Sequence, residues 1–298
     1  MTKKKIKTLS VVSAIVILLA VLCGWVVWGN LTLDVTEYTA ESNLLPKSFS
    51  GYTIAHVSDL HNAEKGENNE KLISALEEAK PDMIAITGDL VDSRHTDIEV
   101  AMEFAKQAVK IAPCYYVTGN HEGRLPNYDS IKNELVEIGV NVMDNSKLEI
   151  KKDGQKITLL GIEDPRMVSV FEEHYARITN YNLNNIAHDV SGYTILLAHR
   201  PELFDTYKAF DINLVLCGHA HGGQVRVPFL GGVLVPNQGF FPEYDAGKFT
   251  ERKTTMIISR GIGNSVVPVR VNNNPELVIV KLEYGTDTEA EQYLTTVQ

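Results

Sequence analysis

The chain has 298 residues, with 28 basic and 38 acidic side chains and a formal net charge of −10 at pH 7. This length is enough for one sizeable hydrophobic core. The acidic balance argues against a nucleic-acid-binding protein, which would carry a basic surface, and three cysteines are too few for a disulfide framework.

The N-terminal segment has the pattern of a membrane anchor. Leu9 to Trp28 is uncharged and apolar over about the length that crosses a bilayer as a helix. Lysines precede this run and acidic residues follow it, which predicts a cytoplasmic N-terminus and an extracytoplasmic folded domain. A cleaved signal peptide is the alternative, but no small-x-small cleavage site follows the run. We therefore expect a single-pass protein of the cell membrane.

The residue pattern divides the chain into segments. We expect two free, buried thiols at Cys114 and Cys217, which lie in or beside apolar runs, and not a disulfide between them. The expected segments are a cytoplasmic basic tail (1–8), a transmembrane signal anchor (9–29), a linker (30–50), one folded domain (51–284) and a polar tail (285–298).

Within the folded domain, five short apolar runs predict buried strands. They are rich in β-branched residues and continuously apolar, which is typical of strands covered on both faces. Stretches with helical apolar spacing, residues 69–80 and 96–111, separate the first three runs. This alternation predicts an α/β core with largely parallel strands. The runs are residues 53–57, 83–87, 115–118, 193–197 and 214–217.

A polar cluster closes each of the five runs. In open α/β sheets, ligands gather beyond the carboxyl ends of the strands. Because every cluster stands at such an end, residues far apart in sequence can converge on one site. The clusters are Asp59–His61, Gly88–Asp92, Gly119–Glu122, Ala198–Arg200 and Gly218–His221.

The residue types in these clusters indicate metal chemistry. Divalent metals that activate water take carboxylate, imidazole and amide-oxygen ligands, and two such metals stand about 3.5–4 Å apart. Gly88 and Gly119 let the backbone turn sharply. Each cluster alone could be a capped turn or an Asx turn, but independent turns would not supply a complete ligand set. The spacing of His219 and His221 leaves open which ion each one binds.

Together the clusters resemble the motif series of the calcineurin-like metallophosphoesterase superfamily. The segments 197–202, 218–225 and 259–263 are similar to its membrane-associated bacterial phosphodiesterase subgroup. The resemblance covers roughly residues 51–283 and implies a four-layer α/β/β/α sandwich with two divalent metal ions, which could be manganese, iron or zinc. The ligands that it implies are Asp59, His61, Asp89 and His221 for one metal, and Asp89, Asn120, His199 and His219 for the other.

The resemblance also implies catalytic roles. A hydroxide that bridges the two metals would attack phosphorus in line. His121 would then donate a proton to the leaving-group oxygen, and Asp92 would hold the imidazole and favour its charged form. Arg124 and Arg200 lie next to candidate ligand positions. Each could reach a phosphate oxygen or form a surface salt bridge.

The expected activity is hydrolysis of a phosphodiester or pyrophosphate bond in an envelope or lipid-linked substrate. One alternative is a phosphomonoesterase acting on phosphoproteins or small metabolites. Another is a non-catalytic scaffold, which would lack a ligand or the proton donor. The apolar segment Val225–Phe241 either contacts lipid or packs on the core as a hairpin, and packing is favoured. Residues 161–191 match no motif. The membrane is the expected partner of the N-terminal helix, and no protein partner is indicated.

Overall fold

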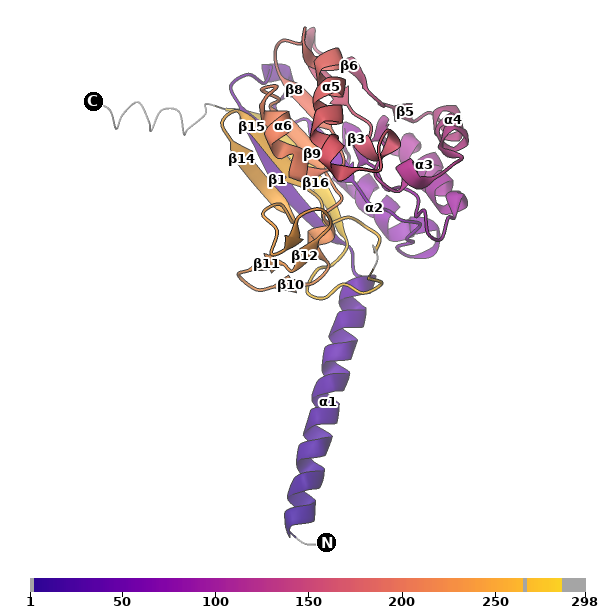
Figure 1. The fold of residues 1–298 in the computed structure, drawn as a ribbon, viewed down its shortest axis with the longest axis vertical. Coiled ribbons are helices and arrows are strands. Elements are labelled where there is room, and N and C mark those ends of the chain that lie inside the picture. The colour runs from indigo at the N-terminus through magenta and orange to yellow at the C-terminus, as the bar shows by residue number, and fades with distance from the viewer. Residues whose placement is uncertain (1–2, 265–266, 286–298) are drawn as a thin grey trace, which may run out of the picture.

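Two six-stranded mixed sheets form the centre of the protein (Figure 1). The computed structural model describes residues 3–264 and 267–285. The strand order is β1-β16-β2-β3-β4-β5 in the first sheet and β14-β15-β9-β8-β7-β6 in the second. The strands of the first sheet are β1 (Asp34–Ser42), β2 (Thr53–Val57), β3 (Met83–Thr87), β4 (Cys114–Val117), β5 (Asn141–Val142) and β16 (Glu276–Tyr284).

The second sheet repeats the parallel arrangement of the first. Strands β2 to β5 are parallel neighbours in the first sheet, and β7, β8, β9 and β15 are parallel neighbours in the second. This confirms the largely parallel core that the apolar runs predict. The strands of the second sheet are β6 (Ser146–Lys152), β7 (Gln155–Gly161), β8 (Thr194–Leu197), β9 (Leu214–Cys217), β14 (Gly247–Glu251) and β15 (Thr254–Ile258).

Helices cover the outer face of each sheet. The helices α2 (Glu70–Ala79), α3 (Ile98–Ile111) and α4 (Tyr128–Ile138) contribute to the apolar cluster on the first sheet. The helices α5 (Tyr175–Ala187) and α6 (Phe204–Lys208) do so on the second sheet. A third cluster fills the space between the sheets. The molecule is therefore the expected four-layer α/β/β/α sandwich.

The alternation of side chains along a strand explains why these strands are apolar throughout. In β3, Ile84 and Ile86 pack against the helices, whereas Met83 and Ala85 face the other sheet. Successive side chains point to opposite faces of a sheet, so a strand covered on both faces needs apolar residues at every position. Cys114 and Cys217 are buried free thiols in such strands, as expected.

Helix α1 (Lys3–Leu31) projects away from the sandwich (Figure 1). Its Ser10–Leu31 portion has 22 residues and is long and apolar enough to cross a membrane. The most apolar stretch of this portion has a mean hydropathy of 2.7 and is not buried. Strand β1 follows α1 after two intervening residues, and the whole of β1 pairs with β16. Residues 30–50, expected as a linker, thus contribute an edge strand to the first sheet. The expected polar tail lies, from residue 286 onward, outside the described residues.

Two small antiparallel ladders follow the last polar cluster. They lie beside the C-terminal end of α1 (Figure 1). The ladders pair β10 (Arg226–Val227) with β11 (Gly231–Gly232), and β12 (Leu234–Val235) with β13 (Gly239–Phe240). Single 3-10 turns occupy the loops at Lys47–Phe49, Glu67–Asn69, Glu122–Arg124, Pro165–Met167, Glu172–His174, Pro201–Leu203 and His221–Gly223.

Candidate metal centre

All five polar clusters lie in loops at the carboxyl ends of β2, β3, β4, β8 and β9. The seven candidate metal ligands of these loops are buried. Five of them, Asp59, His61, Asp89, His219 and His221, have positive φ angles between 46° and 67°. L-residues rarely adopt this conformation, and such strained residues are concentrated at functional sites. The strain indicates that the loops are shaped to direct these side chains.

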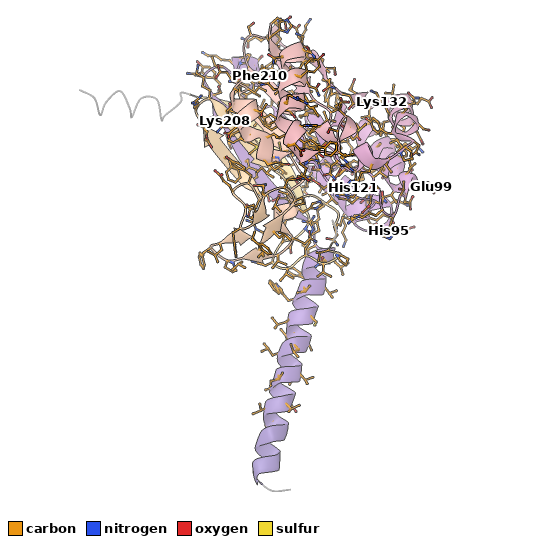
Figure 2. All side chains as sticks on the ribbon, viewed as in Figure 1. His95, Glu99, His121, Lys132, Lys208 and Phe210 are labelled. Carbon is orange, nitrogen blue, oxygen red and sulfur yellow. The ribbon has the colours of Figure 1, made fainter. Side chains whose placement is uncertain are left out.

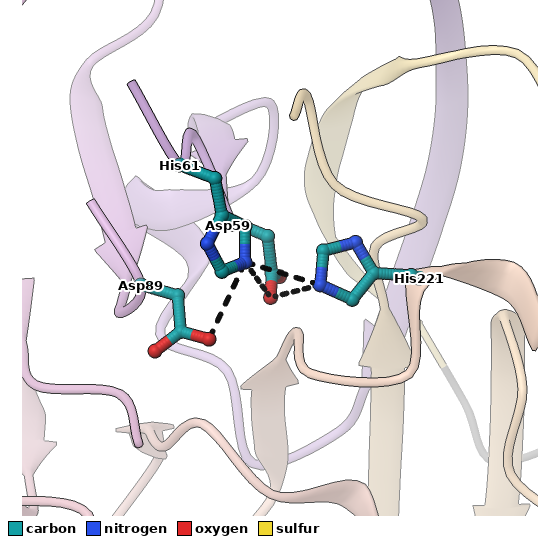
Figure 3. Close-up of side chains that lie close together, drawn as sticks. All are labelled: Asp59, His61, Asp89 and His221. Atoms are coloured by element: carbon teal, nitrogen blue, oxygen red, sulfur yellow. Dashed lines mark hydrogen bonds and ion pairs between the residues drawn. The ribbon is translucent and has the colours of Figure 1, made fainter. Parts of the chain in front are cut away.

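Four of the candidate ligands form a first donor group (Figure 3). The donor atoms of Asp59, His61, Asp89 and His221 all lie within 4.8 Å of one another. The Nε2 atoms of His61 and His221 are 3.2 Å apart, and His221 Nε2 is 3.2 Å from Asp59 Oδ1. Nitrogen and carboxylate oxygen atoms grouped in this way suit a divalent transition metal.

A second donor group shares one carboxylate with the first. Asp89, His199 and His219 form it, again with donor atoms within 4.8 Å. Asp89 Oδ2 lies 3.4 Å from His61 Nε2 and 3.3 Å from His199 Nε2. The same oxygen atom therefore stands between imidazoles of the two groups. Asn120 Oδ1 is buried nearby, and no group in the described part of the chain forms a hydrogen bond to it.

The hydrogen bonding of His199 indicates that a cation can bind between this side chain and Asp89. His199 Nδ1 lies 2.7 Å from the carbonyl oxygen of Thr87, so this nitrogen carries the proton and donates it. When the ring is neutral, the lone pair of Nε2 points toward the Asp89 carboxylate, and Nε2 has no hydrogen-bond partner among the described residues. Two facing acceptors repel each other unless a proton or a metal lies between them. A backbone carbonyl that orients a ligating histidine is common in metal sites.

The charge balance around these groups agrees with a cation site. Burial lowers the pKa of His199, but the Asp89 carboxylate raises it further, to about 10. Burial raises the pKa of the Asp89 carboxyl group, but the neighbouring His199 lowers it by more. The pKa of Asp89 therefore lies well below its usual range. For His221, burial dominates and lowers the pKa to about 3. The ionised Asp89 carboxylate thus stabilises a positive charge beside His199, and a metal ion would take the place of the proton on Nε2, since metals bind the neutral imidazole.

Glu122 holds two of the loops together. Its buried carboxylate accepts hydrogen bonds from the backbone N–H groups of Asp89, Leu90, Val91 and Gly119, at 2.8–3.2 Å. The loop after β3 is thereby tied to the loop after β4. Gly119 is required here because a Cβ atom would overlap the Asp89 side chain. Glu122 is visible in the third motif, but the sequence does not indicate this role.

His121 lies beside His61 of the first donor group, with ring centroids 4.5 Å apart, and lines the site cavity. The backbone N–H of Ser93 donates to His121 Nδ1 at 3.0 Å, so the neutral ring carries its proton on Nε2. Burial lowers the pKa of His121 to about 4, more than Asp89 and Asp92 raise it. Figure 2 shows His121 and the exposed His95 on the globular domain, clear of α1.

Asp92 lies beside His121 and is also paired with Arg94. Its nearest approach to His121 Nδ1 is 3.5 Å, whereas Arg94 donates to both of its oxygen atoms, at 3.1 and 2.6 Å. Asp92 still raises the pKa of His121, although less than burial lowers it. Ser93 and Arg94 follow Asp92 directly, but no sequence pattern marks either of them.

The two candidate phosphate-binding arginines have different surroundings. Arg200 is buried and bonded through Nε and Nη2 to Asp164, at 2.7 and 3.2 Å, and stacks on Tyr175. It is largely committed to this ion pair. Arg124 is exposed, and its Nη1 is 3.4 Å from His121 Nε2. Arg124 is therefore free to contact an anion. This is one of the two roles that the sequence allows for Arg124 and Arg200.

A cavity of about 200 Å³ opens over the two donor groups. Segment 161–191, which matches no motif, supplies Arg166, Glu172 and Tyr175 to its wall. The guanidinium Nε of Arg166 is buried and has no hydrogen-bond partner among the described residues. The full lining is Asp89, Asn120, His121, Arg124, Arg166, Glu172, Tyr175, Arg200, His219, His221, Pro236 and Asn237.

An α/β/β/α sandwich with clustered Asp and His donors at its strand ends defines the class of metal-dependent phosphoesterases. Within that class, residues 52–223 match the model of the calcineurin-like phosphoesterase family, and the chain belongs to this family. The resemblance inferred from the motifs is thereby confirmed.

Two similar proteins are named as metallophosphoesterases. The chain is 27% identical to the uncharacterized metallophosphoesterase YkuE of Bacillus subtilis, over 84% of this chain and 86% of that protein. It is also 27% identical to a transmembrane protein with metallophosphoesterase domain from Danio rerio, over 80% of this chain and 55% of that protein. The crystal structure of TT1561 of Thermus thermophilus superposes with a TM-score of 0.49 and 15% identity, over 72% of this chain and 92% of that chain.

Proposed function

We propose that this protein is a membrane-anchored phosphoesterase with two divalent metal ions that hydrolyses phosphodiester or pyrophosphate bonds of an envelope or lipid-linked substrate. The observation that carries the proposal is the position of Asp89 Oδ2, within 3.4 Å of imidazoles from two donor groups. A carboxylate shared in this way can bridge two cations that stand close together.

The donor groups define which residues would hold each ion. Asp89 is common to both sites, and nitrogen and oxygen donors suit manganese, iron or zinc. When bound, the metals supply an activated water molecule and neutralise charge on the phosphoryl group. The proposed ligands are Asp59, His61, Asp89 and His221 for one ion, and Asp89, Asn120, His199 and His219 for the other.

Other side chains would bind and orient the substrate. His121 presents an Nε2–H group toward the cavity, where it can donate a hydrogen bond to the leaving-group oxygen. Arg124 and Arg166 line the same cavity and would hold phosphoryl oxygens. Asp92 would position His121 indirectly. It accepts a hydrogen bond from the backbone N–H of Arg94 and so fixes the loop whose Ser93 N–H donates to His121 Nδ1.

Membrane anchoring and sidedness form part of the proposal. Helix α1 would cross the cell membrane once, with the lysine-rich N-terminus in the cytoplasm and the sandwich outside. An enzyme held at the membrane surface meets lipid-linked and envelope substrates at high local concentration, which supports that substrate class.

A phosphomonoesterase is the second candidate. The cavity over the donor groups is only about 200 Å³, and a compact cavity favours a small phosphate monoester. Against this, a second hollow adjoins the cavity and leaves room for a larger leaving group.

The test uses the purified full chain in detergent, stripped of metal and reloaded with manganese. Hydrolysis of bis(p-nitrophenyl) phosphate is compared with that of p-nitrophenyl phosphate. We expect the diester to be preferred, and Asp89→Asn to lose most activity and about one equivalent of bound metal, because both sites share this carboxylate. Asp129→Asn, at an exposed position in α4, is the matched control.

Each outcome decides between the candidates. Diester hydrolysis that disappears in Asp89→Asn but persists in Asp129→Asn supports the phosphodiesterase. Preference for the monoester supports the phosphatase instead. Bound metal with no hydrolysis of either compound would contradict the catalytic proposal and favour the scaffold.

A further inference from the structure

An uncharged, apolar surface surrounds the small ladders next to the metal centre. Residues 227–241 contain no charged side chain. The sequence-based preference for packing on the core is wrong for most of the large apolar side chains in this segment, because they are exposed and only Val235 is buried. We call this surface the apolar face; its exposed side chains are Val227, Phe229, Leu230, Leu234, Phe240, Phe241, Val267 and Val269.

The apolar face is attached to the end of helix α1. Asn30 donates to the carbonyl oxygen of Arg270 at 2.8 Å and accepts from its backbone N–H at 2.9 Å. Gln224 in turn donates to the carbonyl oxygens of Val267 and Val269. The residue that precedes the ladders is thus bonded to the same segment, residues 267–270, that Asn30 of α1 contacts. Figure 1 shows the ladders at the end of the sandwich from which α1 projects, so a membrane crossed by α1 would lie beside them.

A groove leads from the apolar face to the metal centre. It encloses about 350 Å³, and its walls include Leu234, Val235, Pro236 and Val267. His221 and Asn237 line both the groove and the cavity over the donor groups. A molecule whose phosphate occupies the cavity could therefore extend an apolar chain along the groove toward the membrane.

We propose that the apolar face rests on the bilayer surface and that the groove binds the hydrocarbon chain of a lipid phosphoester. This inference rests on the proposed function, since it requires both the metal-dependent phosphoesterase and the anchor. A bilayer suits the face because the face is uncharged within a strongly acidic protein and is fixed to the end of a membrane-length helix. Substrate lipid would then enter the site without leaving the membrane interface.

Groove binding is tested with the full chain in phosphatidylcholine–phosphatidylglycerol nanodiscs. The substrates are p-nitrophenyl methyl phosphate and p-nitrophenyl dodecyl phosphate, and the readout is the ratio of their kcat/KM values. We expect Leu234→Asp to lower the dodecyl-to-methyl ratio about tenfold, because each methylene group buried in an apolar groove favours binding. Leu234→Trp, which fills the groove without adding charge, should lower it in the same direction.

Val136→Asp is the matched control, since Val136 is an equally exposed apolar residue on α4. Partition of the long chain into the nanodisc is the same for all variants, so a change in ratio reports the groove. An unchanged ratio in both Leu234 variants would overturn groove binding while leaving the phosphoesterase intact. Failure of the unmodified protein to hydrolyse either ester would instead overturn the proposed function.

Membrane contact is tested separately by fluorescence. In a Cys23→Ser background, in which Cys114 and Cys217 are buried, Phe229→Cys is labelled with the environment-sensitive dye NBD. We expect blue-shifted emission that is quenched by spin-labelled lipid in the same nanodiscs. Tyr181→Cys, at an exposed position on α5, should give solvent-like emission. Solvent-like emission at position 229 as well would overturn the membrane contact and leave the face to a protein partner.

Discussion

At the scale of single residues, the site depends on side chains that hold the loops as much as on the candidate ligands. Glu122 accepts four backbone hydrogen bonds, and His199 is fixed by the carbonyl oxygen of Thr87. Such supporting groups set the direction of ligands and tune their affinity for metal. The positive φ angles of five candidate ligands show that the loops need this support.

Glu122→Gln is expected to weaken metal binding about 10–100-fold, because the amide group presents its own N–H to backbone donors. The variant should also lower the free energy of unfolding by about 1–3 kcal/mol, the cost of leaving buried N–H groups unpaired. Metal titration and urea unfolding measure the two effects. Glu134→Gln, exposed on α4, should change neither. Wild-type metal affinity in Glu122→Gln would show that the loops hold their shape without this carboxylate.

At the scale of elements, α1 and β1 form a continuous connection between the anchor and the first sheet. Only two residues separate them, and β1 pairs with β16 over nine residues. Lys65 Nζ donates to the carbonyl oxygen of Asn30 at 3.1 Å, which satisfies a group at the end of α1. The helix is therefore held by the domain through β1 as well as through Asn30.

Asn30→Ala should release the segment that carries Arg270, because it removes two hydrogen bonds to that backbone. With a net value of about 1 kcal/mol for each bond, we expect amide exchange at Arg270 to accelerate roughly tenfold or more. Hydrogen–deuterium exchange of the full chain in nanodiscs measures this effect. Asn43→Ala, at an exposed position after β1, is the control. Equal exchange in the two variants would mean that α1 is not docked on this segment.

At the scale of the whole molecule, the metal centre lies where two sheets meet. The first sheet supplies Asp59, His61, Asp89 and Asn120 through its loops, and the second supplies His199, His219 and His221. A metal shared between these loops would link the two halves of the sandwich. Binding to the folded state alone raises stability by mass action.

Chelation of metal should therefore lower the melting temperature of the full chain by about 10 °C, from an expected loss of roughly 3–4 kcal/mol. Calorimetry in detergent, with manganese or with EDTA, measures the difference. Asp89→Asn should show a smaller difference, because it removes the shared carboxylate. Identical melting temperatures with and without metal in the unmodified protein would argue that no metal links the sheets.

The sequence by itself determined the α/β class and the position of each polar cluster at the end of an apolar run, and the family resemblance implied the candidate ligand set. Continuous apolar runs and strand-end motifs are local patterns, and they were enough to place Asp59, Asp89 and His199 at one edge. The long apolar segment that forms α1 likewise predicted a helix of membrane-spanning length. A local pattern carries this information because the backbone geometry of a helix or a strand fixes how often side chains return to the same face.

Only the tertiary structure decided how the remaining residues act. Arg166 and Glu172 reach the cavity from a segment without a motif, Arg200 is committed to Asp164, and the large apolar residues of 227–241 lie mostly exposed. Residues 30–50 hold an edge strand because β16, more than two hundred residues later, offers them a partner. These outcomes depend on contacts between segments distant in sequence. No local pattern encodes such contacts, since burial and pairing are properties of the packed chain.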